Sequence, residues 1–153
     1  MGTKRTVVLV LFLALVSAVT SFAQSNETID QILGQDPATT GSAAYVALTA
    51  AGLLDDASTP AKAIAMAKEA GWLPPEAAAN DSATFGVLTH LLMQAFESPG
   101  GLMYRISPGP RYAAREFVYQ GWSPVRVAPN DLITGEFLLQ VTGSFLESQE
   151  GAQ

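Results

Sequence analysis

The sequence predicts an all-α domain of about five or six helices. Three observations favour it: apolar residues recur at helical spacing, helix caps and stops fall at regular intervals, and strand-like segments are scarce. The chain has 153 residues and no cysteine. That length suits one domain, stabilised by its core rather than by disulfides.

Residues 1–23 are interpreted as a secretory signal peptide. Two cations precede an uncharged stretch at residues 6–19, and Ser21 and Ala23 place small side chains at the positions that a signal peptidase reads. The alternative is a retained anchor, although such a stretch is shorter than the ~20 residues that span a bilayer as a helix. We therefore expect an exported protein, periplasmic or extracellular and associated with the cell envelope, without stable membrane insertion after cleavage.

The charge balance of the processed chain excludes some partners. Without Lys4 and Arg5 the net charge of −6 becomes −8, with six cations against fourteen carboxylates. Such an acidic protein is expected to avoid nucleic acid and anionic membrane surfaces.

Helices are expected in order along the rest of the chain, each with its own start or stop signal. Ser25 or Asn26 is a cap for the first, Pro110 suits a first turn, and Gly52, Gly71 and Gly121 are stops. The expected helical ranges are 25–33, 40–51, 60–70, 83–96, 110–120 and 134–146. A short extended or hairpin segment is expected near 101–110, and a flexible polar tail over 147–153.

Two stretches of the predicted single domain, residues 24–146, repeat each other. Residues 60–96 and 110–146 each read as a helix, a Gly-Trp pair, a loop and a threonine-opened helix, and residues 37–52 add a half copy beginning at Thr40. The shared spacing could also arise by chance. One such hairpin cannot bury its apolar stripe, so stacked copies would share a core.

These copies distantly resemble the S-layer homology type of helical repeat over roughly residues 37–146. The matching pieces are Gly121-Trp122, Pro129-Asn130-Asp131 and Ile133-Thr134-Gly135-Glu136, with Gly71-Trp72, Asn80-Asp81 and Ala83-Thr84-Phe85-Gly86 in the weaker copy. The resemblance implies stacked helix-loop-helix units that bind cell-wall glycan. The family's usual Thr-Arg-Ala-Glu motif is lacking, so its glycan-binding arginine has no counterpart here.

Arginines and aromatic residues gather in one part of the chain, which we take as the candidate binding site. Arginine offers a planar fork to carboxylate or phosphate, and aromatic rings stack on sugars, peptides or guanidinium groups. The predicted site residues are Tyr104, Arg105, Arg111, Tyr112, Arg115, Tyr119 and Trp122. In the alternative interpretation, Arg111 and Arg115 cover apolar surface and pair with Glu116, Glu97 or another of the abundant carboxylates, while the tyrosines pack at the core edge.

No catalytic residue, metal site or cofactor is predicted. His90, the one histidine, is expected at the surface or boundary, because no nucleophile or set of further ligands accompanies it. The Asp55-Asp56 and Asn80-Asp81 pairs are expected to be turn and capping acids, since they lack the spacing of a calcium loop. The glycine- and proline-rich residues 98–110 are expected to form a structured connector rather than a phosphate-binding loop.

These features predict a non-enzymatic exported domain that binds or scaffolds another component of the cell envelope through protein–protein contacts. The alternative is a domain similar to S-layer repeats that binds cell-wall glycan. An envelope hydrolase is a third and weaker hypothesis, because no catalytic constellation is visible. The oligomeric state is left open.

Overall fold

A computed structural model describes residues 27–151, and the predicted signal peptide lies outside these residues. Residues 27–33 are helical, and the helices after them are α2 (Thr40–Ala50), α3 (Pro60–Glu69), α4 (Phe85–Ala95), α5 (Leu102–Ile106), α6 (Pro110–Gln120) and α7 (Gly135–Glu150). The all-α prediction is confirmed. Within the described part of the chain, no helix is both long and apolar enough to cross a bilayer.

A closed ring of backbone hydrogen bonds joins three distant parts of the chain. The amide of Ala38 donates to the carbonyl of Ile133 (2.7 Å), Ile133 donates to Ala83 (3.3 Å), and Ala83 donates back to Ala38 (2.8 Å). Each of these residues directly precedes the N-cap threonine of a helix. The ring therefore gathers the starts of α2, α4 and α7 around one centre.

The three N-caps act alike. The hydroxyls of Thr39, Thr84 and Thr134 accept hydrogen bonds from the amides three residues later, at 3.2, 3.3 and 3.2 Å. Such caps satisfy amides that the helix cannot pair internally. The cap of α2 is thus Thr39 and not Thr40, which was expected to open this helix, so the first copy starts one residue earlier.

Loops from neighbouring copies complete these helix starts. The first amide of α2, on Thr40, donates to the Asp81 carbonyl (2.7 Å), and that of α4, on Phe85, donates to Asp131 (2.9 Å). The side chains of Asp81 and Asp131 accept from the amides three residues before them, at 2.7 and 2.9 Å. Asp81 is therefore the turn acid that was predicted, and Asp131 repeats its role.

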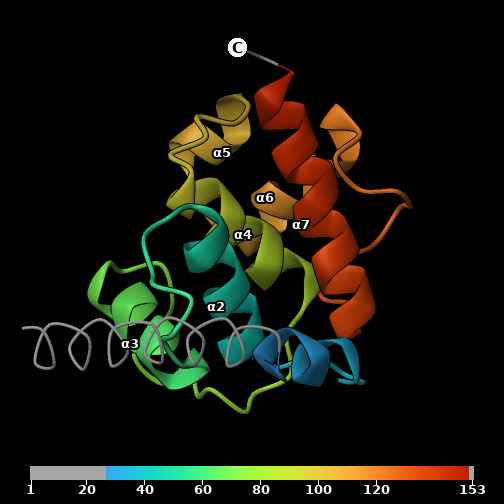
Figure 1. The fold of residues 1–153 in the computed structure, drawn as a ribbon. Coiled ribbons are helices and arrows are strands. Elements are labelled where there is room, and N and C mark those ends of the chain that lie inside the picture. The colour runs from blue at the N-terminus through green and yellow to red at the C-terminus, as the bar shows by residue number, and fades with distance from the viewer. Residues whose placement is uncertain (1–26, 152–153) are drawn as a thin grey trace, which may run out of the picture.

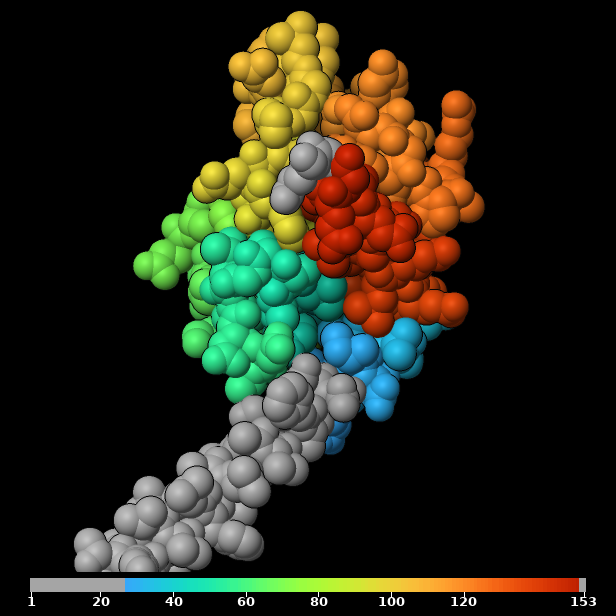
Figure 2. All heavy atoms as spheres, turned by 45° about the horizontal axis from the view of Figure 1, so that its top comes forward, coloured from blue at the N-terminus to red at the C-terminus, as the bar shows by residue number. Residues whose placement is uncertain are grey.

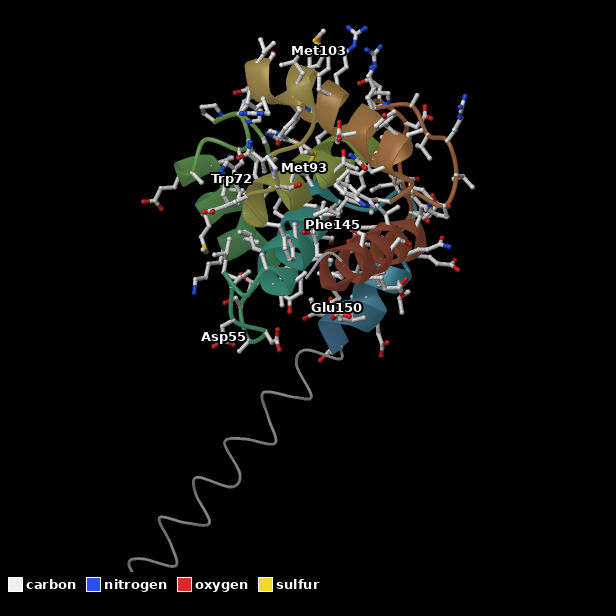
Figure 3. All side chains as sticks on the ribbon, turned by 90° about the horizontal axis from the view of Figure 1, so that it is seen from above. Asp55, Trp72, Met93, Met103, Phe145 and Glu150 are labelled. Atoms are coloured by element: carbon white, nitrogen blue, oxygen red, sulfur yellow. The ribbon has the colours of Figure 1, made fainter. Side chains whose placement is uncertain are left out.

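In the two full copies the first helix packs on the second helix of the preceding copy, α3 on α2 and α6 on α4. Figure 1 shows α3 beside α2, and α4 between α2 and α6. The core is formed by apolar side chains from all these helices, and an aromatic cluster fills the end near α6 and α7. In that cluster Phe117 stacks on Phe145 at 5.1 Å between ring centroids. Figure 3 shows Met93 and Phe145 in the interior.

Two local expectations are wrong. Residues 102–106 are not extended but form the short helix α5, because burial of Tyr104 selects a helical turn that holds this side chain inward. The expected flexible tail is helical as far as Glu150, because Phe145 is fully buried and anchors the last turns of α7.

Gly86, in the first turn of α4, lies where the backbone of the following copy approaches this helix closely. A Cβ atom here would lie 2.8 Å from the Pro129 carbonyl oxygen and 3.0 Å from that of Pro110. We expect Gly86→Ala to lower the free energy of unfolding by about 1–3 kcal/mol, the usual cost of overpacking. Urea unfolding followed by circular dichroism measures this.

Gly143 in α7 is the matched control, because a Cβ atom there meets nothing within 4 Å. Gly143→Ala should be neutral or stabilise by up to about 1 kcal/mol, since alanine favours a helix. Equal effects of the two substitutions would contradict tight packing between α4 and the neighbouring loop.

Candidate binding site

Helix α6 presents two of the three exposed arginines of the predicted site, Arg111 and Arg115. Pro110 occupies its first turn, and Gly121, with a φ of 75°, ends it in a left-handed conformation. Its buried face consists of Ala113, Ala114 and Phe117. Arg111, Arg115 and Tyr119 follow one another at a spacing of four and are exposed.

The loop that follows α6 is fixed at both ends. At its start, the amide of Trp122 donates to the Phe117 carbonyl (2.9 Å), and the indole packs 5.0 Å from Phe145. At its end, the Pro129 and Asp131 carbonyls accept from the first two amides of α4, at 2.8 and 2.9 Å. The residues between them are held opposite α6.

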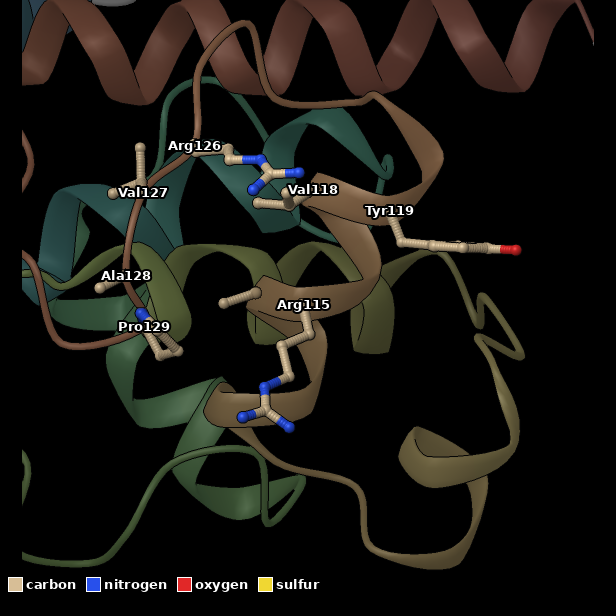
Figure 4. A pocket seen from close by; sticks show the side chains of 8 residues that line it. Arg115, Val118, Tyr119, Arg126, Val127, Ala128 and Pro129 are labelled. Atoms are coloured by element: carbon tan, nitrogen blue, oxygen red, sulfur yellow. The ribbon is translucent and has the colours of Figure 1, made fainter.

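A cleft of about 560 Å³ lies between α6 and this loop (Figure 4). Its lining residues are Ala114, Arg115, Val118, Tyr119, Arg126, Val127, Ala128 and Pro129. Arg115 comes from the helix, whereas Arg126 extends from the loop toward α6, and the Tyr119 ring points away from the others. The cleft thus combines two cationic side chains with an apolar lining.

No carboxylate lines the cleft, and neither arginine has an ion-pair partner within 4 Å among residues 27–151. The carboxylate of Glu116 instead accepts a hydrogen bond from Gln120 at 2.8 Å. The pairing of Arg111 or Arg115 with Glu116 or Glu97, expected in the alternative interpretation, is therefore not formed. Two guanidinium groups without partners can hold a carboxylate or a phosphate.

The structure does not bring all the predicted site residues together. Arg115 and Tyr119 line the cleft, Arg105 and Arg111 are exposed outside its lining, and Tyr112 is half-buried. Tyr104 is buried, and the half-buried Trp122 packs against the core. Trp122 lies beyond the end of α6 at Gln120, and its indole packs in the aromatic cluster rather than beside the exposed arginines.

Arg126 is the cleft residue that the predicted set omits. Its only signal in the sequence is its place among the four arginines between residues 105 and 126. Helical spacing relates Arg111 to Arg115 but says nothing of a loop residue. Only the two anchored ends of the loop bring Arg126 opposite α6.

Tyr104 belongs to a buried polar group that attaches α5 to α4. Its hydroxyl lies 3.1 Å from Nδ1 of His90 and accepts from Nε2 of Gln94 at 3.2 Å. His90 is only 6% exposed, so the expected surface or boundary position is wrong. Burial lowers the pKa of His90 below its ordinary value of 6.5 and raises the pKa of the Tyr104 hydroxyl.

Among residues 27–151, no three His, Asp or Glu side chains lie close enough to hold a metal ion. Comparison with models of protein families, with curated proteins and with solved structures found no match.

The buried His90 makes stability depend on pH in a defined direction. Its pKa is lower in the folded than in the unfolded chain, so the unfolded state binds the proton more readily. This contribution to stability is complete above pH 6.5 and is lost as the pH falls from there toward the lowered value. The free energy of unfolding should therefore decrease on mild acidification.

The test compares wild type with His90→Gln, which keeps a polar group near Tyr104 but does not titrate. Urea unfolding at about pH 7.5 and about pH 5.5, on either side of the ordinary histidine value, should show a smaller decrease in the variant. All other titrating groups are common to both proteins. An identical decrease would show that His90 is not the group responsible.

Proposed function

We propose that this chain is a non-enzymatic, exported binding domain of the cell envelope, and that its α6 cleft receives an acidic segment of a partner protein. One observation carries the proposal: Arg115 and Arg126 come from separate elements and line the same carboxylate-free cleft. A cleft with two guanidinium groups and no counter-charge is suited to a ligand that supplies the charge.

The apolar residues that line the cleft suit an extended peptide as ligand. Val118, Val127 and Pro129 offer apolar surface for the stem of an acidic side chain, while the guanidinium groups hold its carboxylate. The lining includes no histidine, serine or carboxylate that could act as nucleophile or base. The arrangement therefore favours recognition over catalysis.

An acidic cell-wall glycan is the second candidate ligand. The Tyr119 ring is 85% exposed at the edge of the cleft, which suits stacking on a sugar. The helical copies resemble S-layer repeats in their spacing, but a glycan would have to bind through other arginines than the one that family uses. The carboxylate or phosphate groups of such a glycan would bind to the cleft arginines.

The test measures binding of a labelled oligo-glutamate peptide to wild type and to Arg115→Ala/Arg126→Ala. Affinity should fall by about tenfold or more in the variant, because a hydrogen bond to a charged group contributes about 1.5–3 kcal/mol. Higher salt should weaken the wild-type complex. Fluorescence anisotropy gives the dissociation constants.

Lys62→Ala/Lys68→Ala is the matched control, since it removes the same charge from α3 and should bind as wild type does. Co-sedimentation with purified cell-wall sacculi forms a second arm. Sedimentation that depends on Arg115 and Arg126, without binding of the peptide, would replace the protein partner by the glycan. Absence of both kinds of binding would overturn the cleft as a binding site.

A further inference from the structure

Helix α5 directs large apolar side chains outward. Leu102, Met103 and Ile106, here called the α5 tip, are 69%, 61% and 70% exposed. Figure 3 shows Met103 at the outer edge of the molecule, opposite Asp55. The segment containing α5 forms the upper end of the molecule in Figure 2. The tip is therefore a convex projection rather than a groove.

The fold holds this tip firmly in place. Tyr104, in the middle of α5, is buried and bonded to His90 and Gln94 of α4. Gly100, just before the helix, has a φ of 56°, and a Cβ atom there would lie 2.6 Å from the Met93 side chain. One face of the short helix is thus fixed to the core, and the apolar residues on the other face cannot turn inward.

The charge of the protein is segregated toward the same end. Residues 98–126 contain four arginines and a single carboxylate, Glu116. The other described residues contain two lysines and thirteen carboxylates. Arg105, within α5, and Arg111, at the start of α6, are exposed next to the tip in the chain. The apolar tip therefore lies in a cationic region of an otherwise acidic protein.

We propose that the α5 tip docks on an anionic lipid surface, with Leu102, Met103 and Ile106 entering the interface and Arg105 and Arg111 contacting lipid phosphates. A fluid lipid surface adapts to a convex apolar projection, whereas a protein partner needs a cavity of matching shape. Adjacent cations and apolar side chains are the combination that binds anionic membranes peripherally. This contact is separate from the α6 cleft, whose lining contains none of these five residues.

The overall net charge does not oppose this contact. Charges separated by more than about 8 Å are largely screened at physiological salt. The acidic residues of the rest of the molecule therefore act weakly on a membrane that touches the α5 tip. The uneven charge also orients the protein with its cationic end toward an anionic surface.

Sedimentation with vesicles tests the apolar part of the contact. The probes are vesicles of phosphatidylcholine with phosphatidylglycerol, and vesicles of phosphatidylcholine alone. All proteins share the same N-terminus, checked by mass spectrometry, so that residues 1–26 contribute equally. Wild type should bind the anionic vesicles, and Leu102→Ser/Ile106→Ser should reduce the partition coefficient by about tenfold or more.

Leu33→Ser/Leu53→Ser is the matched control, because these side chains are 46% and 48% exposed and lie outside α5. This control should bind vesicles as wild type does. Thermal unfolding verifies that every variant is folded. Leu102 and Ile106 are exposed, so their substitution should leave the melting temperature nearly unchanged.

Charge reversal tests the cationic part. Arg105→Glu/Arg111→Glu should abolish the preference for phosphatidylglycerol, whereas Lys62→Glu/Lys68→Glu, with the same change of charge on α3, should retain more of it. Binding of wild type should weaken as salt is raised. Equal binding to both kinds of vesicle would overturn the cationic part of the proposal.

Absence of vesicle binding by wild type, or unchanged binding by Leu102→Ser/Ile106→Ser, would overturn lipid docking. A dimer in analytical ultracentrifugation that this variant dissociates, with no vesicle binding, would assign the tip to a second copy of the chain instead. The variant should still bind oligo-glutamate through the cleft. Failure of the lipid proposal is thereby distinguishable from failure of the cleft.

Discussion

The ring of hydrogen bonds among Ala38, Ala83 and Ile133 is the constraint on which the rest of the fold depends. Because each of these residues directly precedes an N-cap threonine, the ring fixes where α2, α4 and α7 begin. Because each helix start also pairs with a loop of a neighbouring copy, the copies cannot shift independently. The backbones approach so closely at Gly86 that a methyl group does not fit. Small residues at the helix starts are therefore a requirement of the ring rather than a local preference for flexibility.

The same constraint creates the cleft. The loop after α6 ends where Pro129 and Asp131 complete the start of α4, and it begins where Trp122 enters the aromatic cluster. Between these two anchors the loop runs opposite α6. Its course places Arg126 in the same cleft as Arg115. The hydrogen bonds that pair the first backbone amides of α4 with this loop thus help to determine the position of a candidate recognition site.

Charge distribution matters more in this protein than net charge. Residues 27–151 carry six cations and fourteen carboxylates, a net charge of −8 that predicts repulsion from anionic surfaces, but the arginines are concentrated between residues 105 and 126. Screening over short distances lets one end of the molecule behave as cationic. The proposed cleft and the proposed α5 tip both belong to this end. The buried contact between Tyr104 and His90 holds the two surfaces in a fixed relation, because it attaches α5 to α4, on which α6 packs.

Helix type and order, and the repeated Gly-Trp and threonine signals, follow from the sequence by itself, because spacing and caps act within a few residues. Arg115 and Tyr119 were predictable for the same reason, since one helix places them side by side. Tertiary structure alone decided that Trp122 and His90 turn inward, that residues 102–106 are helical, and that Arg126 faces α6. These outcomes depend on contacts between copies far apart in the chain, and a pattern within one segment carries no information about what will lie against it.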